Sequence, residues 1–82
     1  MSKKSKKAYT LFFPQKLIKE PIMYLVARDQ DLILNIRRAK ITAEFGEATI
    51  ELEGDERNIE NAVKIFEKKG VKVEPVFGDV VQ

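Results

Sequence analysis

Apolar residues recur at every second position in four parts of the chain, and this spacing predicts four strands. Residues 8–13 are apolar on both alternating sets, which is typical of a central strand, and Pro14 ends it. Residues 46–53 alternate strictly between apolar and polar, as a strand with one buried face does. The other two strands are predicted over residues 32–38 and 71–77.

Two further segments carry apolar residues three or four positions apart and predict amphipathic helices. The first follows Pro21, because proline is tolerated in a first helical turn. The second begins after Asp55, a good N-cap residue, and ends before Gly70. The apolar stripes expected to face the core are Ile22, Leu25 and Val26 of the first helix together with Ile18 just before it, and Ile59, Ala62, Val63 and Phe66 of the second helix.

These elements follow the order strand, helix, strand, strand, helix, strand. With right-handed crossovers, a βαββαβ order gives an α+β, ferredoxin-like fold: a four-stranded antiparallel sheet with two helices on one face. The first and third strands are then central, and the second is an edge strand. A chain of 82 residues is too short for two hydrophobic cores, so we expect one domain.

The second strand carries a polar pattern that a plain core strand does not need. Side chains alternate along a strand, so Asn35 and Arg37 should lie about 7 Å apart on the helix-free face. An amide and a guanidinium at that separation can hold a carboxylate together. The alternative interpretation is that an edge strand carries charge to discourage aggregation. On the opposite side, Leu32, Leu34 and Ile36 are expected under the helices.

The helix-free face is also expected to carry apolar side chains from the neighbouring strands. This interpretation places more apolar area there than a solvated sheet face usually shows, so we expect a second subunit, another domain or an apolar ligand to cover it. The residues concerned are Tyr9, Leu11, Phe13 and Ile33.

The chain contains neither cysteine nor histidine. Thiolate nucleophiles, cysteine-ligated metals, the usual general base near neutral pH and the commonest transition-metal ligand are therefore excluded within it. We accordingly expect no enzymatic activity, no metal site and no cofactor.

Charge is unevenly distributed along the sequence. Four of the 15 basic residues lie in the first seven positions, so the rest of the chain has 11 basic and 13 acidic residues. We expect residues 1–7 to form a disordered lysine-rich tail, residues 8–78 a folded domain, and residues 79–82 a frayed C-terminus. The sequence has neither an apolar run of about 20 residues nor a secretory signal, so we expect a cytoplasmic protein without membrane insertion.

Four segments together resemble the NIL domain family: "LFFP", "EPIMYL", "ILNIRRAKI" and "GEATIELEGDERNIENAVKIFEKKGVKVEPV". The resemblance extends from about Thr10 to Val76, and the last segment is its most specific part. The family is named after an Asn-Ile-Leu tripeptide, which here reads Asn35-Ile36-Arg37. NIL domains are ferredoxin-like and related to ACT domains, which are small-molecule sensors.

This resemblance implies a function. NIL domains at the C-terminus of the ATP-binding subunit of methionine-import ABC transporters bind methionine and restrain transport, and others are joined to iron–sulfur segments. The chain is therefore expected to be a non-catalytic regulatory module that binds an amino acid such as methionine at or near a homodimer interface. Its expected ligand-binding residues are Asn35, Ile36 and Arg37. Its expected partner chain is a transporter ATPase or an iron–sulfur protein.

The same residues bear on three other functions. A protein-docking or dimerisation module in a sulfur-metabolism or transporter complex, without its own ligand, is the main alternative. RNA binding on the open sheet face is disfavoured because Glu51 and Glu53 would repel phosphates there. Acylphosphatase chemistry would need an arginine and glycines after the first strand, and residues 14–21 contain neither.

Overall fold

The computed structural model describes residues 3–77. Four strands, two α-helices and a short 3₁₀ turn follow one another along this part of the chain. They are β1 (Lys4–Pro14), η1 (Gln15–Leu17), α1 (Ile22–Asp29), β2 (Ile33–Ile41), β3 (Phe45–Asp55), α2 (Glu56–Lys69) and β4 (Lys72–Val76).

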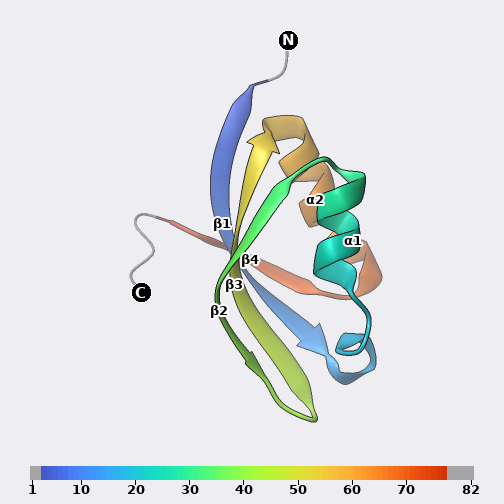
Figure 1. The fold of residues 1–82 in the computed structure, drawn as a ribbon. Coiled ribbons are helices and arrows are strands. Elements are labelled where there is room, and N and C mark those ends of the chain that lie inside the picture. The colour runs from blue at the N-terminus through green and yellow to red at the C-terminus, as the bar shows by residue number, and fades with distance from the viewer. Residues whose placement is uncertain (1–2, 78–82) are drawn as a thin grey trace.

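The strands form one sheet in the order β2-β3-β1-β4, and every neighbouring pair is antiparallel. Both helices pack on one side of this sheet, while the other side is free of helices (Figure 1). The prediction of a ferredoxin-like fold is thus confirmed, with β1 and β3 central and β2 at an edge. Neither helix of residues 3–77 is long and apolar enough to cross a membrane.

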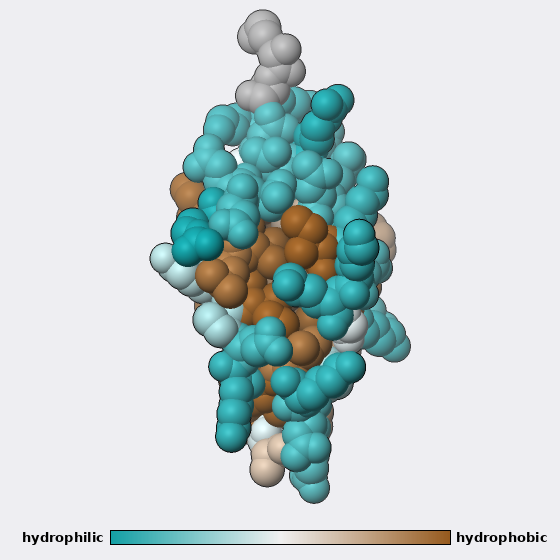
Figure 2. Space-filling view, turned by 90° about the vertical axis from the view of Figure 1, so that its right-hand side faces the viewer, coloured by the Kyte–Doolittle hydropathy of each residue, from teal (hydrophilic) through white to brown (hydrophobic). Residues whose placement is uncertain are grey.

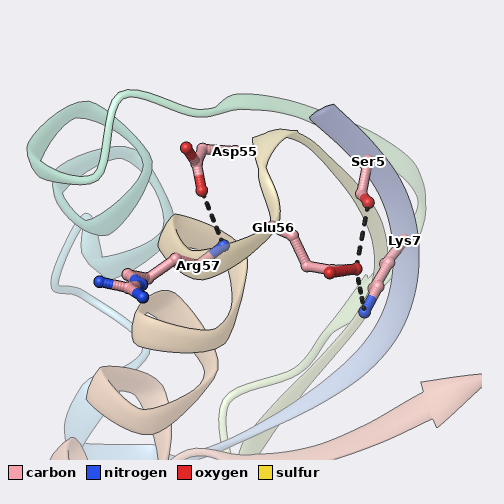
Figure 3. Close-up of polar contacts among 5 residues, drawn as sticks. All are labelled: Ser5, Lys7, Asp55, Glu56 and Arg57. Atoms are coloured by element: carbon pink, nitrogen blue, oxygen red, sulfur yellow. Dashed lines mark hydrogen bonds and ion pairs between the residues drawn. The ribbon is translucent and has the colours of Figure 1, made fainter. Parts of the chain in front are cut away.

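Strand β3 and helix α2 form as their sequence patterns predict. Every second residue of β3 from Gly46 to Gly54 is buried. The carboxylate of Asp55 caps α2 by accepting a hydrogen bond of 2.8 Å from the backbone N–H of Arg57 (Figure 3). Gly70 ends the helix with φ 107°, a left-handed conformation that favours glycine. The most deeply buried large side chains are Phe66, Leu11, Ile50, Leu52 and Ile59.

The assignment of the two faces of β1 was wrong. Leu11 and Phe13 lie in the hydrophobic core, and Tyr9 packs against it on the same helix-bearing side. The helix-free side of β1 instead carries the alternate residues Thr10 and Phe12. Because both alternating sets are apolar, periodicity could not choose between them, and the bulkier set fills the space under the helices. Most of the apolar side chains predicted for the helix-free side therefore lie on the helix side instead.

The lysine-rich start of the chain is also different from the prediction. Lys4–Lys7 belong to β1 and pair with β3 rather than forming a tail. Lys4 lies opposite Asp55 and Lys6 opposite Glu53, so cross-strand pairs of opposite charge favour this extension of the ribbon. The predicted frayed segment, residues 79–82, lies outside the described residues.

The first turn of α2 joins the same ribbon. The Glu56 carboxylate lies 3.7 Å from the Lys7 ammonium and accepts a 3.4 Å hydrogen bond from the Ser5 hydroxyl (Figure 3). The backbone N–H of Glu56 also donates to the carbonyl of Lys3 at 2.7 Å. A carboxylate at a helix N-terminus is stabilised by the helix dipole, so these contacts anchor the extension of β1 to α2.

Candidate functional site

Edge strand β2 contains a β-bulge at the end of the tripeptide Asn35-Ile36-Arg37. Ile36 pairs with Ile50 of β3, but the next paired position is Arg38 with Thr49, which leaves Arg37 as an extra residue. A bulge of this kind breaks the simple alternation of side chains. Arg38 therefore shares the helix-free side with Arg37, and Ile41, which pairs with Gly46, returns to the helix side.

Arg37 is held on the helix-free side by an ion pair with β3. Its guanidinium donates a hydrogen bond of 2.7 Å to the Glu51 carboxylate. This hydrogen bond lowers the pKa of Glu51 below the ordinary carboxyl value. A carboxylate ligand would have to compete with Glu51 for the same guanidinium.

The three predicted ligand-binding residues do not form one cluster. Asn35 lies opposite Glu51 on the helix-free side, where it is exposed and close along the strand to Arg37. Ile36 points to the helix side, opposite Ile50, with 54% of its surface exposed. The Asn35 amide and the Arg37 guanidinium thus lie on one side of the sheet, and the Ile36 side chain lies on the other.

Ile36 lines an apolar cleft on the helix side of the sheet. The cleft has a volume of about 480 Å³ and opens between α1, η1 and β2. Figure 2 shows the hydrophobic surface in the middle of this side, surrounded by hydrophilic residues. The deeper walls are formed mainly by Phe13, Leu17, Ile22, Ala27, Leu32 and Leu34.

Two of the residues that line the cleft are small, and the helix beside it is short. Helix α1 has only eight residues, and one of its residues that line the cleft is the small Ala27. Gly46 lies at the far end, and a Cβ there would be 3.7 Å from the side chains of Phe13 and Ile41. This end of the cleft therefore has room for additional atoms.

Polar groups on α1 and the loop before it lie at the rim of the cleft. The Arg28 guanidinium lies 5.6 Å from the centre of the Tyr24 ring, one helical turn away, and donates a 3.1 Å hydrogen bond to Asp29. That hydrogen bond raises the pKa of Arg28 above its ordinary value. Glu20, in the loop before α1, also lines the cleft.

The spacing of apolar residues predicted only a core-facing role for α1, and the rim residues were not predicted. The available signal was the spacing of Tyr24 and Arg28, because an aromatic residue and a cation four positions apart share one face of a helix. Tyr24 is 63% exposed, which is unusual for a large aromatic side chain in an apolar segment. Within residues 3–77, no group of three acidic side chains is placed to hold a metal ion.

Comparisons with known proteins place this geometry in context. The family model described as "NIL domain" matches residues 7–75. Among solved structures, the fold is similar to the C-terminal domain of an ABC transporter ATP-binding protein from Enterococcus faecalis. That similarity has a TM-score of 0.77 at 25% sequence identity, and it covers 89% of this chain and 86% of the other. The search of proteins with curated functions found no match.

Proposed function

The chain belongs to the NIL domain family, and on this premise we propose that it is a non-catalytic regulatory module that binds a small amino acid with an apolar side chain, such as methionine. The similar Enterococcus faecalis structure is the C-terminal domain of an ABC transporter ATP-binding protein. By analogy, we propose a cytoplasmic role beside a transporter ATPase, with an iron–sulfur protein as an alternative partner.

The observation that carries the proposal is the apolar cleft between α1 and β2. Its volume of about 480 Å³ lies within the range of about 300–1,000 Å³ that is typical of small-molecule sites. Such sites combine apolar walls with a few polar groups that fix the ligand's orientation. The cleft has this composition, and Met23 in its lining adds a flexible thioether that can adapt to the shape of a ligand.

The rim residues can recognise the charged end of an amino acid. Arg28 is already paired with Asp29 through Nε and Nη2, so in our proposal the guanidinium N–H groups that Asp29 leaves free hold the ligand's carboxylate. Glu20 attracts the ligand's ammonium group. Ile36, one of the predicted ligand-binding residues, contributes an apolar wall. Asn35 and Arg37 lie across the edge of β2, and we propose that they reach the ligand only from a second copy of the domain.

The predicted homodimer remains part of this proposal and also supports the alternative function, a docking module without its own ligand. Three large apolar side chains at the cleft mouth are exposed: Tyr24 by 63%, Ile36 by 54% and Ile41 by 64%. A second copy packed on them would remove this apolar surface from water. Mass measurement by light scattering across protein concentrations tests the dimer.

A thermal-unfolding panel with free amino acids tests ligand binding. At a ligand concentration ten times the dissociation constant, binding linkage stabilises the domain by about 1.4 kcal/mol. In a domain of this size that corresponds to a rise in Tm of roughly 6–11 °C. We expect this rise with methionine or another apolar amino acid, and no rise with aspartate or lysine.

Three variants locate the ligand. Arg28→Met keeps the apolar stem and removes the charge, so it should abolish the rise in Tm. Lys64→Met, on the exposed surface of α2, makes the same charge change away from the cleft and should leave the rise intact. A rise that survives Arg28→Met but is lost in Asn35→Ala would move the site to the helix-free side of β2. If no amino acid raises the Tm, the docking alternative replaces this proposal.

A further inference from the structure

The two edges of the sheet differ in their capacity to accept another strand. Strand β4 has five residues and includes Pro75, which lacks the backbone N–H that a new neighbour would need. Strand β2 has nine residues without proline, and all of them are exposed except the half-buried Leu34. The long edge at β2 is therefore the better place for an added strand.

The bulge divides β2 into two halves with different chemistry. The first half, Ile33–Ile36, carries no charge. The second half, Arg38–Ile41, turns Arg38 and Lys40 to the helix-free side and Ala39 and Ile41 to the helix side. It therefore presents cations on one side and apolar groups on the other.

The two cations of this half lack acidic partners within the described residues. The guanidinium of Arg37 is neutralised by Glu51 at 2.7 Å, but among residues 3–77 no salt bridge engages Arg38. Lys40 lies opposite Glu47 in the strand register, yet it forms no ion pair with it there either. Both cations are thus available to acidic groups on an incoming strand.

We propose that the Arg38–Ile41 half of β2 accepts an extended segment of a different protein, in which acidic and apolar residues alternate. Directly opposite residues of paired strands share one face, so acidic side chains would meet Arg38 and Lys40 while apolar ones would meet Ala39 and Ile41. Backbone hydrogen bonds to the free edge would supply affinity, and the alternating contacts would supply specificity.

A second copy of this chain is a poor occupant of the same edge. Strand β2 contains three cations and no anion, and only Arg37 is neutralised by an ion pair, so pairing the basic half with itself would bring four uncompensated cations to one shared edge. Like charges on neighbouring strands destabilise the pairing. A homodimer formed through the apolar side chains at the cleft mouth would use a different contact, so this inference does not depend on the ligand or on the dimer.

The test is an NMR titration of the isotope-labelled full chain at low salt with two capped hexapeptides. One peptide alternates glutamate and valine, and the other has lysine in place of each glutamate. We expect the acidic peptide to shift the backbone amides of residues 38–41 in a saturable manner, and the basic peptide to bind at least tenfold more weakly. Added salt should weaken the binding of the acidic peptide.

Charge reversal separates the proposed pairing from general electrostatics. Arg38→Glu with Lys40→Glu should weaken binding of the acidic peptide by roughly tenfold or more and should strengthen binding of the basic peptide. Lys19→Glu with Lys64→Glu changes the net charge equally, from +2 to −2, at exposed positions away from this edge. This control should bind the acidic peptide nearly as the unmodified chain does.

Several results would overturn the proposal. If neither peptide shifts residues 38–41, the basic edge protects the sheet from pairing instead of recruiting a partner. Equal binding of the two peptides would remove the role of charge. Shifts of the same amides on dilution, without peptide, would make a second copy the occupant of this edge.

Discussion

A methyl group added at Gly54 tests how tightly the end of β3 packs against Leu32, which lines the cleft. The Cβ of Gly54→Ala would lie 2.7 Å from the Cδ2 of Leu32 and 3.4 Å from the carbonyl oxygen of Asp31. Gly54 also has a φ of 155°, which L side chains rarely adopt. The substitution therefore combines backbone strain with overpacking.

The expected loss of stability is the sum of these two effects. Backbone strain of this kind costs about 1–3 kcal/mol, and forcing an extra methyl into a packed core costs about 1–3 kcal/mol more. We therefore expect Gly54→Ala to lower the free energy of unfolding by about 2–6 kcal/mol. A chain of this length has a total stability of only about 4–12 kcal/mol, so the loss would be plain in urea denaturation.

Two further variants show whether the contact between the added Cβ and Leu32 causes the loss of stability. Gly46→Ala is the matched control, because its Cβ would meet its neighbours at 3.7 Å, an ordinary contact distance, and it should be close to neutral. Leu32→Ala in the Gly54→Ala background should cost less than in the unmodified chain, since it removes the clash. If Gly54→Ala costs no more than Gly46→Ala, the account of this packing is wrong.

Three other perturbations have expected outcomes that follow from single contacts. Arg37→Met should raise the pKa of Glu51 toward its ordinary value in an NMR titration. Because the Glu51 pKa is lowered in the folded state, the ion pair stabilises the fold at pH values above the ordinary carboxyl pKa. This stabilisation should disappear as the pH falls through the pKa of Glu51 in the folded state. An unchanged Glu51 pKa would contradict the ion pair. Asp55→Ala should lower stability by about 1 kcal/mol through loss of the N-cap, measured by urea denaturation, whereas Asp55→Asn should restore most of it. Burial raises the pKa of Tyr9, so stability should fall as the pH rises past the ordinary tyrosine value, and Tyr9→Phe should reduce this fall; an identical alkaline profile would refute the assignment.

Local signals in the sequence predict much of the fold. In β3, strict alternation identifies the buried set because only one set is apolar. At α2, Asp55 and Gly70 mark the two ends, since an N-cap carboxylate and a left-handed glycine each satisfy backbone groups that the helix leaves free. These features depend on residues that are close together in the chain, so they can be predicted from the local sequence.

Features that depend on contacts between distant segments could not be predicted in this way. In β1, the choice of face depends on how the bulk of Phe13 fits under the helices. The lysines before Ala8 form a strand because β3 supplies acidic partners across the ladder. The bulge at Arg37 depends on the register between β2 and β3, and it alone places Arg38 beside Arg37 and returns Ile41 to the helix side.

The candidate site shows the same division. Asn35 and Arg37 were placed correctly on the helix-free side. Alternation along one strand could not reveal that Glu51 would form an ion pair with the Arg37 guanidinium. The cleft is formed by residues from two helical segments and three strands, with Gly46 leaving room at one end. Such a cavity arises only when these segments pack together.

Binding of an amino acid through its apolar side chain in the cleft between α1 and β2 can be observed at the residues that line the cleft. The most direct measurement is a methyl NMR titration of the chain with free methionine. At protein concentrations at which light scattering gives a monomer, the methyl groups of Ala27, Leu34, Ile36 and Ile41 should shift in a saturable manner, and those of Ile33 on the helix-free side should not. Saturable shifts at Ile33 with unchanged cleft methyl groups, or no shift at any of them, would contradict binding in the cleft.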